Sequence, residues 1–406
     1  MNIRTITLFA GILSLTSAYA QADDSLEDAL LNGKLLLNLR YRYEHDDQNG
    51  LKNDANASTL RTRIGYETGY FDHIKGVFEM ENVSNIGPTD FNNTINNRTN
   101  FPRVNDPSAT DINQLYLETN IIPQTDVTVG RQRMTFDNSR FVGAAGWRQN
   151  DPTFDALRIV NTSIPDVQAI YSYSDNVFRN LGDKDPLNNY GAHINLAHLA
   201  YTGIPDITLA TYGYFVGLDN AATLSSKTFG VRGEGRYPLP DDFKLTYLAE
   251  YARQSDYDNN PDSFDLGYYR IEPGVGWKGL HASIGDEVLE GNGKDAVQTP
   301  LSSNHPFNGW ANKFSTTPPD GLDDKFVTAG YTTASTIQYF GNVQISSAWH
   351  DFTAYVGDSH YGNEGDISIS KTFDKRTTVS LEYNDYLANS FGTNTQKIYM
   401  MVNYLY

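Results

Sequence analysis

The chain contains no cysteine among its 406 residues. This absence excludes a disulfide framework, a zinc site held by thiolates and a cysteine nucleophile. Basic residues are also scarce, because 31 Lys and Arg stand against 49 Asp and Glu, which gives a net charge of −18. A nucleic-acid-binding domain needs an excess of positive charge on one surface. The sequence therefore argues against nucleic acid as a partner.

Long apolar runs are missing beyond the N-terminus. No later segment reaches the roughly 18 consecutive apolar residues that a membrane-spanning helix needs, which excludes a helical membrane protein. At the N-terminus, Arg4 precedes an apolar stretch, and Ala18-Tyr19-Ala20 forms a small-x-small cleavage site. We expect a signal peptide over residues 1–20, with cleavage after Ala22 as the alternative, and therefore export from the cytosol.

Catalytic and metal-binding motifs are weak as well. Residues 256–262 begin like a calcium loop, but Pro261 stands where the tight-turn glycine belongs and Gly267 where the bidentate glutamate belongs. His350 precedes Asp351, yet no serine at a recognisable nucleophile elbow accompanies this pair. We therefore predict neither an enzyme nor a bound metal or other cofactor.

What the sequence does contain is a period-two alternation of apolar and polar residues. Residues 34–44 place one set of apolar side chains on a single face: Leu35, Leu37, Leu39, Tyr41 and Tyr43. Residues 58–70 repeat the alternation in the opposite register. A strand that has an apolar face and ends in tyrosines is typical of a transmembrane β-barrel, because its outer face meets lipid and its inner face meets water.

Short turns alternate with long loops along the chain, as they do at the two rims of an outer-membrane barrel. We predict one all-β domain over residues 21–406, a transmembrane antiparallel β-barrel of about 18 strands with both termini in the periplasm. A count of 16 strands is the alternative, because the pattern is least distinct over residues 326–348. The last strand ends in Tyr406, and such an aromatic end resembles the signal read by the barrel-assembly machinery of Gram-negative bacteria.

Residues 127–160 carry the densest group of arginines, with strand residues at either end of a long loop. We expect loop 135–152 to fold into the lumen and to narrow the pore. In this segment Val129 shares its parity with Arg131, and an arginine facing lipid at mid-bilayer costs roughly 2–4 kcal/mol. The odd residues of that strand are therefore predicted to face inward. The constriction would then carry five positive and two negative charges: Arg131, Arg133, Arg140, Arg148 and Arg158 against Asp137 and Asp155.

Two earlier strands add four further lumen arginines: Arg40, Arg42, Arg61 and Arg63. Rings of arginine set an anion preference in a pore. The opposing interpretation is a lumen wall of ion pairs that neutralise one another, because many glutamates share the inner faces. Both interpretations stay open at this point.

Two features concern the loops. Loop 291–324 contains His305, Phe307, Trp310 and Phe314, and we favour a self-packed plug over a surface that stacks on sugar rings. Acidic side chains are predicted at the outer rim, where divalent cations would bridge them to lipopolysaccharide phosphates, although we favour simple solubility as the explanation, because runs of surface charge usually serve nothing more. These residues are Asp46, Asp47, Asp256, Asp258, Asp262, Asp320, Asp323 and Asp324.

Several segments resemble the alginate-export family of Gram-negative outer-membrane barrels. They are GRQRMTFDNSRFVGAAGWRQNDPTFDALRIV, NLRYRYEHDDQNG followed by STLRTRIGYETG, and QTPLSSNHPFNGWANKF. The resemblance covers most of the mature chain and implies an 18-strand monomeric pore that passes an anionic saccharide through an arginine-rich constriction. By position it implies that Arg131, Arg133 and Arg158 line this constriction.

We therefore predict an outer-membrane channel for small solutes, either anionic saccharides or carboxylates. A general or differently selective porin and a closed structural or adhesive barrel are the alternatives. The expected partners are outer-membrane lipid, lipopolysaccharide and small anionic solutes.

Overall fold

The computed structural model describes residues 25–144, 146–337 and 339–406, so the predicted signal peptide lies outside the described residues. Within these ranges the chain forms 18 strands, a short helix α1 (Leu26–Leu31) and a 3-10 turn η1 (Ala222–Leu224). The strands are β1 (Lys34–Gln48), β2 (Ala55–Glu67), β3 (Ile74–Asp90), β4 (Ala109–Ile122), β5 (Thr125–Gln132), β6 (Thr153–Asn161), β7 (Val167–Phe178), β8 (Asn189–Ile204), β9 (Ile207–Leu218), β10 (Ser226–Pro238), β11 (Phe243–Asp256), β12 (Asp265–Trp277), β13 (Leu280–Leu289), β14 (Leu322–Thr332), β15 (Val343–Thr353), β16 (His360–Phe373), β17 (Thr377–Ala388) and β18 (Thr395–Leu405).

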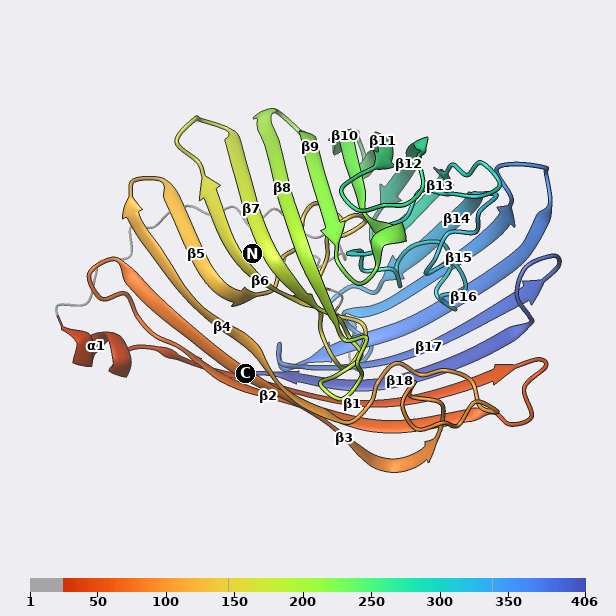
Figure 1. The fold of residues 1–406 in the computed structure, drawn as a ribbon, viewed down its shortest axis with the longest axis horizontal. Helices are drawn as coiled ribbons and strands as arrows, with labels where there is room; N and C mark the ends of the chain where they lie inside the picture. The colour runs from red at the N-terminus through yellow and green to blue at the C-terminus, as the bar shows by residue number, and fades with distance from the viewer. Residues whose placement is uncertain (1–24, 145, 338) are drawn as a thin grey trace.

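Each strand pairs antiparallel with its neighbours in sequence, and β1 pairs with β18. The pairing of β1 with β18 runs from Asn38 opposite Leu405 to Gln48 opposite Thr395 and closes the sheet into a barrel. The prediction of an 18-strand antiparallel barrel is confirmed, and the 16-strand alternative is excluded. Figure 1 shows the strands wrapping around the interior, with α1 beyond the strand ends at the lower left. Among the described residues, no helix is long and apolar enough to cross a membrane.

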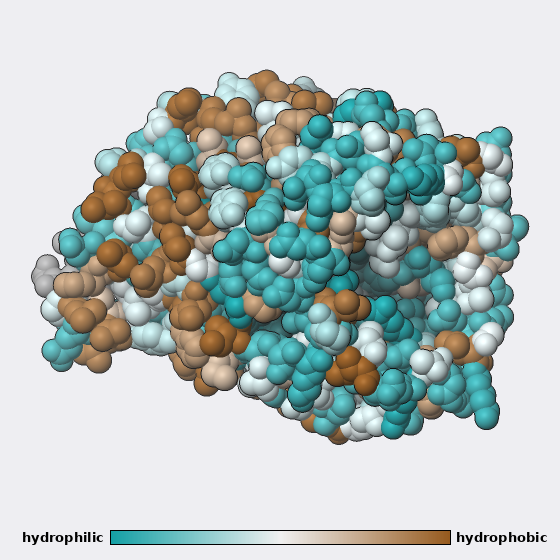
Figure 2. Space-filling model, in the orientation of Figure 1, coloured by the Kyte–Doolittle hydropathy of each residue, from teal (hydrophilic) through white to brown (hydrophobic). Residues whose placement is uncertain are grey.

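The two faces of the barrel differ as the alternation predicts. Large apolar side chains such as Leu117, Ile271 and Ile284 are exposed on the outer face. Figure 2 shows apolar residues gathered over the left part of this view and hydrophilic residues around the end that carries the long loops. Inside the barrel, apolar side chains from the inner face of the strands pack against two long loops, 133–152 and 290–321. The interior is therefore partly filled by the protein's own loops.

Connections at the two rims differ in length. One rim has tight turns such as 205–206 and 278–279, whereas the other carries 91–108, 133–152 and 290–321. At the 278–279 turn, Lys278 has φ 46° and Gly279 has φ 89°. A two-residue hairpin turn whose twist matches the strands needs such left-handed values at both positions. The alternation of short and long connections predicted from the sequence is thus present.

Two of the acidic residues predicted for the outer rim lie elsewhere. Asp46 belongs to β1, is buried on the lumen face and lies 3.1 Å from the Lys397 ammonium. Asp324 belongs to β14, is fully buried and lies 2.9 Å from the His350 ring. The prediction that these carboxylates meet lipopolysaccharide was wrong for both, because each is buried inside the barrel.

Candidate functional site

Four arginines of β1 and β2 form a basic wall, which we define as Arg40, Arg42, Arg61 and Arg63. Arg40 stands directly opposite Arg61 in the β1–β2 register. Arg42 and Arg61 are each only 1% exposed. Like charges that face each other across two strands destabilise a sheet, and a buried charge is costly unless it is paired. The wall therefore needs carboxylates from other parts of the chain.

Loop 133–152 supplies one of these carboxylates. The Asp151 carboxylate lies 3.7 Å from Arg61, 2.5 Å from Arg63 and 3.2 Å from Arg133. Strand β3 adds Glu81, which lies 2.5 Å from Arg63, and Glu79, which pairs with Arg133. Asp151 therefore joins the loop to the basic wall and to the start of its own segment.

A second set of ion pairs holds the same loop. Arg148 lies 2.8 Å from Glu44 on β1 and 3.6 Å from Asp106 of loop 91–108. Arg42 lies 3.3 Å and 3.8 Å from the same two carboxylates. Burial disfavours the charged form of Arg148, but Glu44 and Asp106 outweigh this effect and raise the pKa of Arg148 above its usual value. Arg148 therefore stays charged, and both arginines are bound to the loop junction.

Hydrogen bonds complete the contact between wall and loop. Arg40 donates to the Gly146 carbonyl at 2.6 Å, and Arg42 donates to the Trp147 carbonyl. Gln149 is fully buried, and its side-chain amide donates to the Thr59 hydroxyl at 2.9 Å. By binding main-chain carbonyls, these guanidiniums hold the loop against the basic wall inside the lumen.

The charge of this region is close to balanced. Six arginines meet five carboxylates, which leaves a net charge of +1: Arg40, Arg42, Arg61, Arg63, Arg133 and Arg148 against Glu44, Glu79, Glu81, Asp106 and Asp151. The sequence had indicated a net +3 from a different set. Most of these charges therefore anchor the loop.

The prediction that the odd residues of β5 face the lumen was wrong. Val129 is 55% exposed and stands opposite Leu117, whereas the buried Thr128 stands opposite Glu118 and Arg158. Arg131 therefore shares the outer face with Leu115, its partner across the β4–β5 ladder. The cost of an outward arginine falls to about 0–1 kcal/mol near the membrane interface, and β5 ends at the next residue.

On this outer face Arg131 has its own set of partners. Its guanidinium binds the Asp155 carboxylate through two bonds of 2.8 and 3.1 Å. It also donates to the Ile112 carbonyl at 3.2 Å and lies 3.7 Å above the Phe178 ring. Arg131 and Asp155 thus join β4, β6 and β7 at the rim, and they do not line the lumen as predicted.

The remaining predicted residues are dispersed. Arg140 is buried at the opposite side of the lumen, 2.6 Å from Glu287 of β13. Asp137 lies 2.9 Å from the His198 ring of β8. Arg158 faces the lumen beside Ser172 of β7 and forms no ion pair with any described residue. The five arginines predicted to line one constriction are therefore divided, with Arg133 and Arg148 at the basic wall and the other three elsewhere.

Loop 290–321 meets loop 133–152 inside the barrel. The Trp147 and His305 rings are stacked, with centroids 3.5 Å apart and an interplanar angle of 4°. The Gly143 amide donates to the Leu301 carbonyl at 2.9 Å, and the Ser303 amide donates to the Ser139 carbonyl at 3.1 Å. We call this set of contacts the loop clasp. It agrees with the expectation that loop 291–324 packs against the protein itself.

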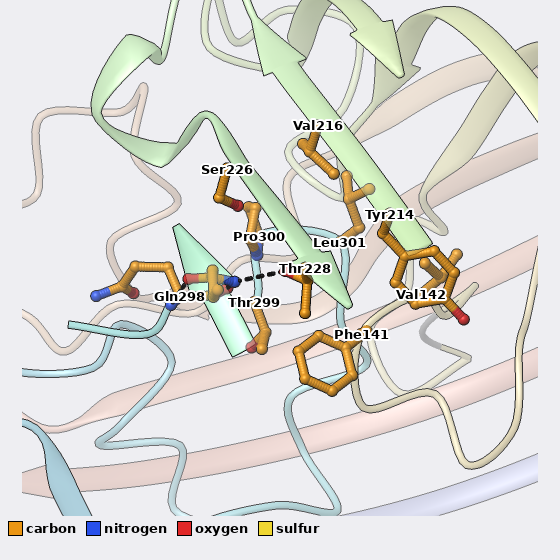
Figure 3. Close-up of a pocket in the computed structure, with 11 residues that line it drawn as sticks. Phe141, Val142, Tyr214, Val216, Ser226, Thr228, Gln298, Thr299, Pro300 and Leu301 are labelled. Atoms are coloured by element: carbon orange, nitrogen blue, oxygen red, sulfur yellow. Dashed lines mark hydrogen bonds between the residues drawn. The ribbon is translucent and has the colours of Figure 1, made fainter. Parts of the chain in front are cut away.

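Figure 3 shows the seam where both loops meet the barrel wall. Phe141 from one loop and Leu301 from the other line this seam together with Tyr214 of β9. Gln254 of β11 donates to the Thr228 hydroxyl at 3.0 Å and to the Gln298 carbonyl at 2.9 Å. The amide of Gln254 is thus fully used in joining loop to wall, and the seam is part of the anchoring.

Sequence reasoning missed an acidic group on the lumen face of β13–β17. It consists of Glu287, Asp324, Glu364, Asp366 and Glu382, all buried. His350 lies beside Asp324, and His305 lies 3.4 Å from Glu382. Each residue has inward parity on its own strand, which is the signal available in the sequence, but the grouping depends on barrel closure. Among the described residues no three His, Asp or Glu side chains are arranged to hold a metal ion.

Comparison with known proteins places this architecture in a family. The family model described as alginate export matches residues 33–268, more than half of the chain. The chain therefore belongs to the alginate export family, as its sequence resemblance predicted. No curated protein matches the chain in sequence.

Solved structures show the same fold at low sequence identity. OccAB2 of Acinetobacter baumannii is 15% identical with a TM-score of 0.73, covering 93% of this chain and 99% of its own. OpdK of Pseudomonas aeruginosa, crystallised with vanillate, is 12% identical with a TM-score of 0.72 over 93% and 99%. OpdL of the same organism is 14% identical with a TM-score of 0.71 over 93% and 99%. These matches extend the fold assignment to nearly the whole chain.

Proposed function

We propose that this chain is an outer-membrane channel of a Gram-negative bacterium that passes small anionic solutes, either acidic saccharides or carboxylates. Family membership and the closed barrel support the channel class. The observation that carries the anion preference is a pair of lumen guanidiniums, Arg40 and Arg158, that form no ion pair among the described residues. Arg40 binds carbonyl and amide oxygens instead. Both are partly exposed, so a passing carboxylate can reach them.

The negative net charge of the whole chain does not oppose the preference for anions. Much of the negative charge outside the lumen sits in loops, where water and salt screen it beyond about 8–10 Å. Solutes are discriminated where the pore is narrow and fixed charges act at short range. The region where loop 133–152 crosses the basic wall carries a net +1, which favours weak anion selectivity.

Reversal potentials in a salt gradient test the proposal, with Arg158→Ala compared against Arg131→Ala. The two arginines lie on neighbouring strands but on opposite faces of the wall. One unit charge at 4 Å in water contributes about 1 kcal/mol, so Arg158→Ala should lower the anion-to-cation permeability ratio by up to about fivefold. Arg131→Ala should leave the ratio unchanged.

Three results would contradict this account. Cation selectivity in the unmodified protein would mean that the lumen glutamates govern the pore. Equal effects of Arg131→Ala and Arg158→Ala would mean that the assignment of faces fails. Absence of conductance would favour a closed structural or adhesive barrel, which the loop clasp favours among the alternatives.

We also propose which partners surround the barrel. The apolar outer face would contact outer-membrane lipid, and the loop-bearing rim would meet lipopolysaccharide. The C-terminal strand ending in Tyr406 would be read by the barrel-assembly machinery. We expect a monomer, as the resemblance to the alginate-export family implies.

A further inference from the structure

We propose that helix α1 is a membrane-interface anchor, which lies on the lipid side of the barrel and inserts its leucines among the lipids of the periplasmic leaflet. The proposal rests on the proposed function only in that the barrel must lie in a membrane. Nothing in the sequence pattern of the strands requires a helix at this position.

The side of the barrel on which α1 packs follows from Tyr66 of β2. Tyr66 stands opposite Leu35 of β1 and Phe78 of β3. Leu35 and Phe78 are exposed on the outer face, as is Ile64, two residues before Tyr66. Alternation therefore places the Tyr66 ring outside the lumen. The Tyr66 hydroxyl donates to the Leu30 carbonyl in α1, so the helix is held by an outward-facing side chain.

Further contacts fix the helix at this rim. The Gly69 amide, just after β2, donates to the Ala29 carbonyl at 2.8 Å, and Ala29 is 1% exposed. The Ser25 hydroxyl caps the first turn by accepting from the Asp28 amide at 3.0 Å. A helix of six residues is not stable alone in water. The tether to Tyr66 and Gly69 thus holds α1 against the barrel.

The leucine side chains of α1 are largely exposed. Leu26, Leu30 and Leu31 are 56%, 49% and 72% exposed. Figure 1 shows α1 at one end of the barrel, beside the turn between β2 and β3, and Figure 2 shows apolar residues there that adjoin those of the outer wall.

Lipid is the occupant that this position favours. The outer face next to α1 continues the apolar surface through Leu35, Ile64 and Ile74, all exposed. Tyr66 lies near the strand end, where amphipathic rings mark the level of the lipid headgroups. Exposed leucines at the level of the lipid headgroups are what a helix lying in the plane of the membrane presents to lipid, and Glu27 and Asp28 would remain among the headgroups.

The absence of cysteine makes a direct test simple, because each introduced cysteine is the single labelling site. A nitroxide on Leu31→Cys is compared with one on Leu117→Cys, at the exposed outer face of β4, and one on Ser163→Cys, in the exposed turn 162–166 at the same rim. In proteoliposomes, collision with oxygen reports lipid and collision with a water-soluble nickel chelate reports water. The Leu31 label should favour oxygen over nickel severalfold relative to the Ser163 label.

Each other outcome has a defined meaning. A Leu31 label as accessible to nickel as the Ser163 label would overturn the anchor. A Leu31 label shielded from both reagents would also overturn it, because protein would then cover the helix. If the Leu117 label is also exposed to nickel, the barrel does not sit in the membrane as proposed, and the failure lies with the proposed function.

Discussion

At the residue scale, Asp151 holds more of the site together than any residue predicted from the sequence. Its carboxylate contacts Arg61, Arg63 and Arg133, and its side chain is 3% exposed. A buried ion pair is weak evidence of net stabilisation, because desolvation offsets the attraction between the charges. Removing one partner is nevertheless costly, because the others remain buried without compensation. Asp151 is therefore the residue at which the loop–wall contact is most vulnerable.

We expect Asp151→Asn to lower the free energy of unfolding by roughly 3–5 kcal/mol, the range for breaking a buried pair. The measurement is urea-dependent unfolding from lipid bilayers. Asp155→Asn is the matched control, because Asp155 also binds an arginine through two bonds but its side chain is 33% exposed. Its loss should cost no more than about 1 kcal/mol. Equal effects of the two substitutions would contradict the assignment of Asp151 to a buried network.

At the element scale, loops 133–152 and 290–321 fill the barrel and hold each other through the Trp147–His305 stack. Burial lowers the pKa of the His305 imidazole, and Arg42 and Arg148 act in the same direction, although Glu382 opposes them. The clasped form therefore binds fewer protons than a form in which His305 meets water. By linkage, the clasp is complete above the ordinary histidine pKa of about 6.5 and weakens as pH falls through that value.

The expected result is a higher single-channel conductance at about pH 5.5 than at about pH 7.5, because protonation of His305 favours the opened loops. His305→Gln should remove most of this dependence. His73→Gln serves as the control, since His73 is exposed in a turn at the opposite rim and its ring lies 3.0 Å from the Asn120 side chain. A pH dependence that survives in the His305 variant would show that the clasp does not control conductance.

The elements differ in how much of them could be predicted from the sequence. The strands were predictable, because alternation in a two-faced wall is local and repeats along the chain. The face of β5 was not, because the rule that arginine avoids lipid depends on depth, and Arg131 lies one residue from the strand end. The partners of the loops were not predictable either. Asp106 reaches Arg148 only because 91–108 and 133–152 fold toward the same wall.

The candidate site, too, was predictable in its strand positions but not in the partners of its residues. Inward parity correctly placed Arg40, Arg42, Arg61 and Arg63 on the lumen face of β1 and β2. It gave no information on which carboxylates meet them, since Glu44, Glu81 and Asp151 come from three separate segments. The net charge of a constriction therefore requires the three-dimensional structure, even when its strands are evident from the sequence.

At the scale of the whole molecule, an acidic chain of low mean hydropathy forms a barrel with an apolar outer face and a charged interior. Only every second strand residue meets lipid, which explains the polar average. The interior is not uniformly polar, because the loops bury apolar residues such as Phe136, Leu301 and Phe314 in the lumen. The barrel is thus stabilised from within by loop packing as well as by its closed ladder of strands.

We propose that this barrel conducts solutes around its inward loops. Stepwise currents across a planar lipid bilayer, recorded with the purified full-length protein, test it most directly. We predict discrete conductance steps with a reversal potential on the anion side in a salt gradient. A protein that inserts into the bilayer, as the Leu117 label would report, but passes no current would contradict the claim and identify a closed barrel.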